Sequence, residues 1–353
     1  MTDNRGWRPA AVRMLSVSLL LVAAGCGEQA SYQTFTGTTM GTQYRVQASC
    51  SAVSKQPDRL QKNEIDAQLE AINALMSTYQ ADSVLSRFNA SPPGDWYEVP
   101  RALVVVVKAA LSLSEQSEGA YDITVGPLVN LWGFGPEGRP TAVPDTAALE
   151  NARERVGYKY LHVRAQPPAL RKDRDLYVDL SSIAKGYGVD VLAEWLAQQS
   201  CGNFLVDIGG EVRTRGVNSR GEPWRIGVEV PDPARFGMVQ RIIDVSNLSV
   251  ATSGDYRNFL EFGGKRYSHT IDPRTGRPVQ HHLASVTVLH RSAMWADGYA
   301  TLLEVLGGEQ GYAFAVERHL AALLIERSPE GISERVTPDF DPLLEHSGIE
   351  PPP

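Results

Sequence analysis

The chain has 353 residues, of which 42% are hydrophobic and 21% are charged. This composition is ordinary for a globular protein and allows two domains or one large two-lobed domain. The formal net charge is −7 and the pI is about 5.6. The acidic balance argues against a nucleic-acid-binding protein, which usually needs a basic surface, so a phosphate ligand would have to be bound by local donors or by a metal ion.

The first 25 residues have the pattern of an export signal. Three arginines precede the apolar stretch MLSVSLLLVAAG, which is too short for a comfortable membrane span. The stretch ends at Cys26, in AAGC, which resembles a bacterial lipobox. We therefore expect a lipoprotein signal peptide at 1–25, a tether at 26–36, and a lipid anchor on Cys26 at the periplasmic side of the inner membrane. An ordinary cleaved signal with an incidental cysteine is the alternative.

The remaining periodicity predicts a mixed α+β fold. In chain order it predicts a strand at 43–48, a helix at 56–80, a helix at 101–117, an ordered loop at 118–138, a strand at 176–180, a helix at 182–199, strand-like segments between 203 and 290, a helix near 293–306 and a strand at 321–327. Helices and strands are partly segregated, and several strands form hairpin-like pairs. This pattern favours mostly antiparallel sheets over a doubly wound parallel sheet.

Cys50 and Cys201 are the cysteines that follow the predicted signal and anchor. In an oxidising compartment they would be able to pair, but two separate buried thiols fit the sequence equally well. The chain has no CxxC motif or Cys/His cluster of the kind that indicates a zinc site.

Asp297 and Thr301 are the strongest candidates for metal ligands. They lie four residues apart in AMWADGYATLLEVLG, so the expected helix places a carboxylate and a hydroxyl on one face. Both are hard oxygen ligands of the kind that Mg²⁺ prefers, together with water and a substrate phosphate. A structural role also fits, with Asp297 as a helix N-cap and Thr301 bonded back to a carbonyl group.

The segment DLSSIAKGYGVD (179–190) predicts a strand that leads directly into a helix. The first turn of a helix offers unpaired N–H groups and the positive end of its dipole, which suit a phosphate. Asp179 and Lys185 flank this turn. The glycine spacing differs from that of a phosphate loop, so an amphipathic helix with solvent-facing charges is the alternative.

His269 lies in SHTIDPRTGRPV (268–279), a stretch whose prolines and glycine predict a turn. An imidazole with a pKa of about 6.5 suits a general base. Arg274 and Arg277 fit either a role in orienting a phosphate or a plain surface turn. The absence of a G-x-S-x-G or a G-x-G-x-x-G motif disfavours serine hydrolases and dinucleotide-binding dehydrogenases.

Eight stretches together resemble the ApbE family of FAD:protein FMN transferases. In family order they are GTTMGTQYRV, LMSTYQADSVLSRFN, GAYDITVGPLVNLWGFG, DLSSIAKGYGVD, FLVDIGGEV, VATSGDYRNF, YSHTIDPRTGRPV and ADGYAT. The resemblance runs from about residue 34 to 327. It implies a two-lobed α+β fold of mixed, mostly antiparallel sheets and packed helices, with a ligand cleft between the lobes, over residues 37–340. We expect a loose tail at 341–353.

The resemblance also implies roles for single residues. Members of the family bind FAD with Mg²⁺ at its pyrophosphate, and they transfer FMN to a threonine hydroxyl of a target protein, releasing AMP. Asp297, Thr301 and the carbonyl group of Ser182 match the metal ligands, and His269 matches the proposed base. The positions that match the flavin or nucleotide site are Met40, Tyr79, Ala120, Tyr121, Asp122, Asp179, Lys185 and Ile271.

Three functions compete at this point. The first is the transferase, with FAD as substrate, Mg²⁺ as cofactor and exported subunits of ion-pumping redox complexes as acceptors. The second is a Mg²⁺-dependent FAD pyrophosphatase, which uses water as the acceptor and gives FMN and AMP. The third is a flavin-binding lipoprotein without turnover, which would need neither the Asp297–Thr301 pair nor His269. We expect the transferase, and no nucleic-acid partner.

Overall fold

The structure, a computed structural model, describes residues 1–2, 31–50, 60–232, 237–255, 258–329 and 331–340. The predicted signal peptide, its Cys26 anchor and the tail at 341–353 lie outside these residues. The chain divides into two units, residues 1–30 and 31–353, and every described helix and strand belongs to the second unit.

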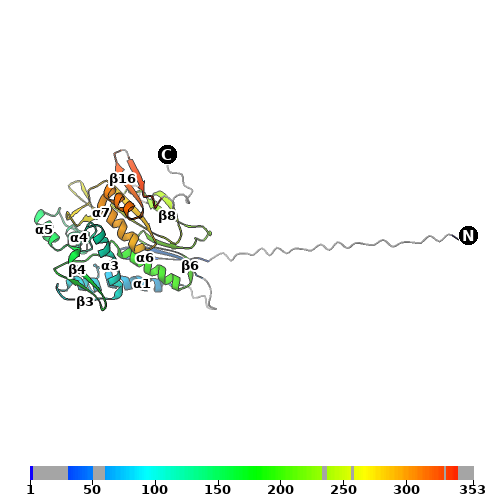
Figure 1. Cartoon of the computed structure of the whole chain (residues 1–353), viewed down its shortest axis with the longest axis horizontal. Coiled ribbons are helices and arrows are strands. Elements are labelled where there is room, and N and C mark those ends of the chain that lie inside the picture. Colours follow the sequence, from blue (N-terminus) through cyan, green and yellow to red (C-terminus); the bar gives the residue numbers. More distant parts are fainter. Residues whose placement is uncertain (3–30, 51–59, 233–236, 256–257, 330, 341–353) are drawn as a thin grey trace. The chain divides into compact units, whose positions relative to one another are not determined.

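An antiparallel sheet organises the described part of the second unit (Figure 1). Each neighbouring pair in this sheet is antiparallel. The expected α+β fold with mostly antiparallel sheets is therefore confirmed. Its strands, in spatial order, are β1 (Gln33–Thr39), β2 (Thr42–Cys50), β6 (Cys201–Ile208), β7 (Glu211–Arg215), β10 (Ser249–Gly254), β15 (Leu283–His290), β16 (Ala321–Ser328) and β17 (Gly331–Val336).

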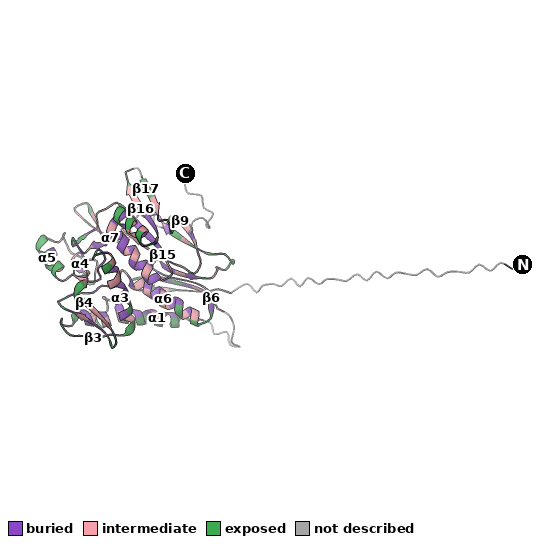
Figure 2. Cartoon of the chain, in the orientation of Figure 1, coloured by how far each residue is buried: buried purple, intermediate pink, exposed green. Residues whose placement is uncertain are grey.

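Helices cover one face of this sheet in two layers. Helices α6 (Ala184–Gln198) and α7 (Ala293–Glu317) pack on the strands, and α1 (Lys62–Met76) and α3 (Arg101–Gln116) pack on α6 and α7. The apolar side chains between the layers form the two largest buried clusters, and Figure 2 shows buried residues along α6, α7 and the strands beneath them. The hairpin of β8 (Trp224–Glu229) and β9 (Val239–Val245) covers part of the opposite face with a separate core.

Shorter elements complete the described chain. Three small sheets pair β3 and β4 with β5, β11 with β12, and β13 with β14. Their bounds and those of the short helices are β3 (Tyr97–Glu98), β4 (Leu161–Ala165), β5 (Pro168–Lys172), β11 (Phe259–Phe262), β12 (Lys265–Ser268), β13 (Ile271–Asp272), β14 (Arg277–Pro278), α2 (Val84–Ala90), α4 (Gly126–Leu131), α5 (Thr146–Glu154) and the 3₁₀ helix η1 (Tyr158–Tyr160).

Two tight turns lie together at one end of the sheet. Met40 (φ 49°) and Gly41 (φ 73°) join β1 to β2, while Gly209 (φ 64°) and Gly210 (φ 103°) join β6 to β7. Positive φ at both central residues is the geometry of a type I′ hairpin. A Cβ atom on Gly209 would lie 2.7 Å from the side chain of Thr42, so glycine allows the two hairpins to approach closely.

The first expected helix is shorter than its pattern indicated. Its apolar stripe from Ile65 to Met76 is buried, as expected, but α1 ends at Met76 and not at residue 80. The hydroxyl of Ser77 accepts hydrogen bonds from the N–H groups of Tyr79 and Gln80, which turns the chain. Tyr79 therefore lies outside the helix and is 70% exposed.

Three other boundaries differ from the expectations. The loop expected at 118–138 contains α4, which a proline in its first turn helps to begin. The strand expected at 176–180 makes only one isolated bridge, because the side-chain amide of Asn89 exchanges two hydrogen bonds with the backbone of Val178 in place of a neighbouring strand. The helix expected near 293–306 continues beyond a kink at Gly307 to Glu317.

A disulfide joins Cys50 at the end of β2 to Cys201 at the start of β6. Pairing is thus the alternative that the structure shows for these two cysteines.

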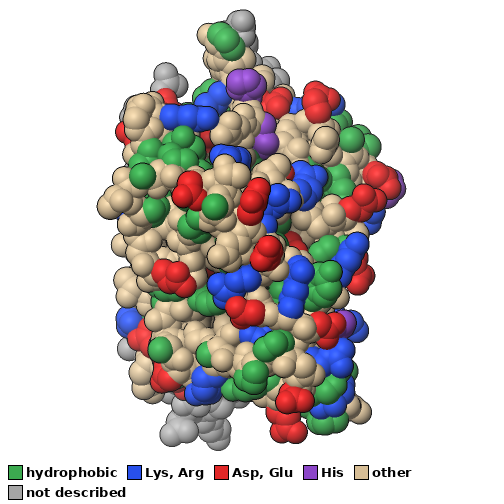
Figure 3. Space-filling view, turned by 90° about the vertical axis from the view of Figure 1, so that its left-hand side faces the viewer, with side chains coloured by type: hydrophobic (Ala, Val, Ile, Leu, Met, Phe, Trp, Pro, Cys, Tyr) green, Lys and Arg blue, Asp and Glu red, His purple; other side chains and the backbone are tan. Residues whose placement is uncertain are grey.

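The surface carries charges of both signs. Acidic and basic side chains are interspersed over the face shown in Figure 3, unlike the basic stripe by which many proteins bind nucleic acids. Among the described residues, no helix combines the length and the apolar character needed to cross a membrane.

Candidate functional site

A cavity of about 1150 Å³ gathers side chains from distant parts of the sequence. It lies where the β6–β7 turn, the first turn of α6, the segment of α7 from Asp297 to Val305 and the loop after β12 meet. Nine of the predicted site residues line it, namely Ala120, Tyr121, Asp122, Ser182, Lys185, His269, Ile271, Asp297 and Thr301. The structure brings these residues together, while their individual roles stay predictions.

Met40, Tyr79 and Asp179 are not among the residues that line this cavity. Met40 is half-buried and packs between the two helical cores, where its Cε atom lies 3.1 Å from the place of a Cβ on Gly188. The side chain of Met40 therefore points into the core and not into the cavity.

Tyr79 and Asp179 lie close to the cavity-lining residues. The hydroxyl of Tyr79 donates to the carbonyl oxygen of Phe134 over 3.2 Å, and the Phe134 ring meets the His269 ring edge to face. Asp179 is buried, and its Oδ1 accepts from the N–H of Ser181 over 2.7 Å. Partial desolvation raises the pKa of Tyr79, and the negative charge of Asp179 raises it further.

A close contact between α6 and α7 places Asp297. Its Oδ2 accepts a hydrogen bond from the N–H of Gly186 over 2.9 Å, and its side chain is buried. A Cβ on Gly186 would lie 2.2 Å from the carbonyl oxygen of Ala293, so a side chain there would push the helices apart. Thr301, one turn further along α7, lies 3.2 Å by its Oγ1 from the Oγ of Ser253.

The hydrogen bond from the Gly186 N–H to Asp297 leaves the carbonyl group of Ser182 without its usual helical partner. In a regular helix this N–H would bond the carbonyl group four residues earlier, which belongs to Ser182. It bonds Asp297 instead, and the Ser182 carbonyl accepts no hydrogen bond from any described residue. The Ser182 hydroxyl pairs with the hydroxyl of Tyr121 at 2.8 Å, which leaves the carbonyl oxygen as the donor atom available to a cation.

The oxygen donors fit a hard divalent cation. They are a carboxylate, a hydroxyl and a backbone carbonyl, from Asp297, Thr301 and Ser182, at one cavity wall. Mg²⁺ takes such oxygen ligands in small number and completes its shell with water and phosphate. No group of three or more His, Cys, Asp or Glu side chains in the described ranges is arranged to hold a metal ion.

Glu211 adds a charge that the sequence reading missed. It is the first residue of β7 and is 2% exposed, and its Oε1 lies 2.6 Å from the Nζ of Lys185. Burial raises the pKa of Glu211 to about 7, opposed by the ammonium of Lys185 and supported by the charge of Asp297. A glutamate placed directly after a Gly-Gly hairpin was the available signal.

Burial also raises the pKa of Asp297, against the opposing effects of Lys185 and of the Gly186 N–H. Lys185 therefore interacts electrostatically with two buried carboxylates, those of Asp297 and Glu211. All three side chains line the cavity.

The backbone selects one tautomer of His269. Its Nδ1 lies 3.1 Å from the carbonyl oxygen of Asn258, and a carbonyl can only accept, so Nδ1 carries the hydrogen. The other ring nitrogen, Nε2, is then the basic one. Burial lowers the pKa of His269, and the charge of Lys185 lowers it further, so the ring is neutral at pH 7.

The two arginines of the same loop do not line the main cavity. Arg274 forms a paired contact with its neighbour Asp272, with two N···O distances of 3.0 Å, and Arg277 is exposed. For Arg274 the geometry agrees with the surface-turn interpretation. Gly276 (φ 71°) completes the turn, and its carbonyl accepts from the indole N–H of Trp132 over 2.9 Å.

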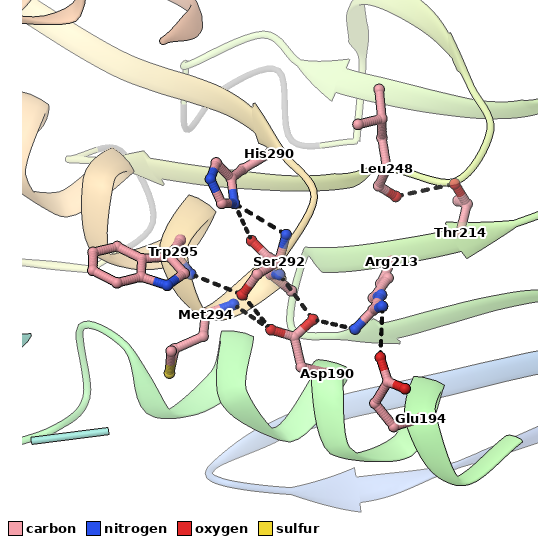
Figure 4. A network of polar contacts seen from close by, with 10 residues as sticks. Asp190, Glu194, Arg213, Thr214, Leu248, His290, Ser292, Met294 and Trp295 are labelled. Atoms are coloured by element: carbon pink, nitrogen blue, oxygen red, sulfur yellow. Dashed lines mark hydrogen bonds and ion pairs between the residues drawn. The ribbon is translucent and has the colours of Figure 1, made fainter. Parts of the chain in front are cut away.

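A second tie between α6 and α7 supports the site from outside the cavity (Figure 4). The carboxylate of Asp190 accepts from the hydroxyl of Ser292 over 2.6 Å and from the N–H groups of Ala293 and Met294 over 2.9 and 3.0 Å. Arg213 of β7 completes the network at 2.8 Å. Asp190 lies one turn after Gly186, so two successive turns of α6 hold the first two turns of α7.

Comparisons with known proteins place these features in a family. The sequence model of the ApbE family matches residues 40–324. A Vibrio cholerae protein described as an FAD:protein FMN transferase is 45% identical over 332 residues, which cover 94% of this chain and 98% of the relative. A Haemophilus influenzae protein of the same description is 41% identical, covering 94% of this chain and 97% of the relative.

Solved structures agree with the fold. The flavin transferase ApbE from Vibrio cholerae superposes with a TM-score of 0.81 at 44% identity, covering 89% of this chain and 99% of that one. The apo form of the flavinyl transferase ApbE from Pseudomonas stutzeri gives a TM-score of 0.81 at 40% identity, covering 89% of this chain and 97% of that one.

Proposed function

This chain belongs to the ApbE family, and we propose that it is an FAD:protein FMN transferase that moves the FMN moiety of FAD to a threonine hydroxyl of an exported acceptor protein. The observation that carries the proposal is the shared cavity, which holds a neutral imidazole, an ammonium group and a set of oxygen donors. The imidazole is suited to act as a base, the ammonium group to bind a diphosphate, and the oxygen donors to bind a divalent cation.

Asp297, Thr301 and the Ser182 carbonyl would hold Mg²⁺, because they are the available hard oxygen donors of the cavity wall. When bound, Mg²⁺ offsets the charge of the diphosphate and stabilises the charge that develops as its P–O bond breaks. The carboxylates of Asp297 and Glu211 face a single ammonium group, that of Lys185. Because the negative groups outnumber the positive one, an anionic ligand needs such a cation here.

The residues of the chain supply binding and proton transfer. Lys185 would bind the diphosphate of FAD. His269 would accept, at Nε2, the proton of the threonine hydroxyl as the hydroxyl oxygen bonds to the phosphorus of the FMN moiety. The P–O bond to AMP breaks in the same step, and AMP leaves with the bonding electron pair. General-base help of this kind contributes about 10²–10⁴-fold.

The cavity also has room for a segment of an acceptor protein. Its volume of about 1150 Å³ exceeds the roughly 300–1,000 Å³ of typical small-molecule sites. It is lined by the consecutive residues 224–227 of β8. Because successive strand residues point to opposite faces, consecutive residues can line one cavity only if the cavity runs along the edge of the strand. The edge of β8 therefore borders the cavity.

The cellular setting is part of the proposal. The signal-like N-terminus and Cys26 support a lipid-anchored protein on the periplasmic side of the inner membrane, with subunits of ion-pumping redox complexes as acceptors. The Cys50–Cys201 disulfide supports an oxidising compartment.

Mass spectrometry of the acceptor tests the proposal. The purified chain is incubated with FAD, Mg²⁺ and a subunit of an exported ion-pumping redox complex. The expected result is a mass gain of one FMN unit on a threonine, with one AMP released per label. Asp297→Ala should abolish labelling, while Glu317→Ala, at an exposed position on the same helix, should leave it intact.

Two outcomes would contradict the transferase. Release of FMN and AMP with an unlabelled acceptor would indicate a pyrophosphatase with water as acceptor. Retention of unchanged FAD in the presence of Mg²⁺ and the acceptor would indicate a flavin-binding protein without turnover.

A further inference from the structure

Glu211 differs from Asp190 of α6 in how its carboxylate oxygens are used. Its Oε1 pairs with Lys185, but its Oε2 is buried and has no hydrogen-bond partner among the described residues. Asp190, by contrast, closes four hydrogen bonds within its network. Leaving a buried acceptor unsatisfied is destabilising, so stability alone does not account for Glu211 at this position.

The backbone holds Glu211 in place. It pairs with Ile208 across the two-residue Gly209–Gly210 turn, and the N–H of Gly210 donates to Asp207 Oδ1 over 2.9 Å. The turn packs against Thr42 of the neighbouring hairpin. The Glu211 carboxylate is therefore held at a fixed place in the cavity lining, whereas the long side chain of Lys185 has many rotamers to lose on binding a ligand.

From this geometry we propose that Glu211 is a positioning residue, which holds the Lys185 ammonium at the cavity wall where that ammonium binds the diphosphate of FAD. The inference rests on the proposed function insofar as FAD is the ligand. Because Lys185 is already oriented by Glu211, less conformational entropy is lost when FAD binds.

Glu211 also has an unfavourable electrostatic effect on FAD binding, so the direction in which FAD affinity changes on substitution is informative. A carboxylate near a diphosphate repels it, so if repulsion were the main effect of Glu211, its neutralisation would tighten FAD binding. If positioning is the main effect, neutralisation weakens binding. Glu211→Gln has nearly the same size, removes the negative charge and replaces one acceptor oxygen by an NH2 donor, so the direction of its effect on FAD affinity separates the two.

The test measures FAD affinity at equilibrium, by flavin fluorescence titration in the presence of Mg²⁺, together with the kcat and KM for FMN transfer. Glu211→Gln should weaken FAD binding by at least about tenfold, the scale seen when an orienting partner of a binding residue is lost. KM should rise by the same factor, and kcat should change by less than about threefold. Glu211→Asp, which keeps the charge, should recover part of the loss.

The effect of Glu211→Gln is also measured in the Lys185→Met variant, which tests whether Glu211 acts through Lys185. If Glu211 acts through Lys185, Glu211→Gln has no further effect on FAD affinity in the Lys185→Met variant. Glu194→Gln is the matched control, because Glu194 of α6 likewise forms an ion pair between α6 and β7, with Arg213, but is exposed. It should leave FAD affinity unchanged. Circular dichroism melting verifies that each variant is folded.

Unchanged or tighter FAD binding in Glu211→Gln would overturn the inference, as would a full effect of Glu211→Gln in the Lys185→Met background. Neither result touches the proposed function, which would still show as acceptor labelling by the unmodified chain. Conversely, an unmodified chain that binds FAD without labelling any acceptor would refute the transferase and leave the role of Glu211 measurable by affinity. A chain that binds no FAD would refute both.

Discussion

At the scale of single residues, backbone groups decide how the site side chains are presented. The Asn258 carbonyl determines which nitrogen of His269 carries the hydrogen. The Gly186 N–H bonds Asp297 and thereby leaves the Ser182 carbonyl without a partner in the described chain. Neither effect depends on the type of side chain at Asn258 or Ser182. The carbonyl group of Ser182 is therefore available as a ligand although the hydroxyl of Ser182 pairs with Tyr121.

The lowered pKa of His269 predicts the pH dependence of transfer. The base form must be unprotonated, and burial together with Lys185 disfavours the imidazolium. The kcat/KM for FMN transfer should therefore rise with pH through an acid limb below about 6.5, the ordinary histidine value, and be level above it. Rates measured across the acid range with a fixed acceptor verify this.

Substitutions separate His269 from other titrating groups. His269→Ala should lower kcat by about 10²–10⁴-fold and remove the acid limb, while His319→Ala, at an exposed histidine, should change neither. Persistence of the acid limb in His269→Ala would show that another group is the base.

At the scale of elements, the site depends on how α6 is held against α7 and on the β6–β7 hairpin. Gly186 and Asp190 lie one turn apart on α6, and each bonds a different turn of α7. The hairpin places Glu211 beside the first turn of α6. A shift of one helix along the other would move Asp297 relative to Lys185 and Ser182, so these ties determine the geometry of the donor set.

Loss of the hydrogen bonds that Asp190 makes between α6 and α7 should strongly reduce the stability of the fold. Asp190→Ala removes an acceptor for the first N–H groups of α7 and the partner of Arg213. We expect the free energy of unfolding to fall by about 2–4 kcal/mol, since a helix cap contributes about 1 kcal/mol and hydrogen bonds to a charged group about 1.5–3 each. Urea unfolding followed by circular dichroism measures the change.

Glu194→Ala is the control for Asp190, because Glu194 bonds the same arginine from an exposed position. Exposed ion pairs contribute about 0.2–1 kcal/mol, so its effect should be several times smaller. Equal losses in the two variants would show that the arginine, and not the cap on α7, carries the stability.

At the scale of the whole molecule, the disulfide lies on two strands that also line the ligand cavity, but outside the cavity itself. The cavity-lining residue of β2 nearest to Cys50 is Gln47, three residues away, a separation of about 10 Å in an extended strand. The bridge joins residues 151 positions apart in sequence. It therefore constrains the unfolded chain strongly without contacting the site.

Removing the disulfide should reduce stability and leave FAD affinity unchanged. The Cys50→Ser, Cys201→Ser double variant should lose about 2–4 kcal/mol in the free energy of unfolding. Thermal melting with and without a reductant provides the measurement: the reductant should lower the melting temperature of the unmodified chain and leave that of the double variant unchanged. Equal responses to the reductant would contradict a structural disulfide.

Much of the fold was predictable from local patterns. The strand at 43–48, the buried stripe of α1 and the shared face of Asp297 and Thr301 follow from periods of two and about 3.6 residues. The extended segment at 176–180 was misjudged because a distant amide, that of Asn89, satisfies its backbone where a strand would. The end of α1 was misjudged because the Ser77 side chain competes for the next N–H groups.

The sequence by itself determined the α+β class, the family and nine residues that line the cavity, because periodicity and short motifs are properties of neighbouring residues. Only the tertiary structure decided that Cys50 pairs with Cys201, that His269 presents Nε2, and that Glu211 faces Lys185. Each of these is a relation between segments brought together by folding. Distance, burial and the direction of a backbone group in such a contact depend on the packing of the whole molecule, which no local pattern contains.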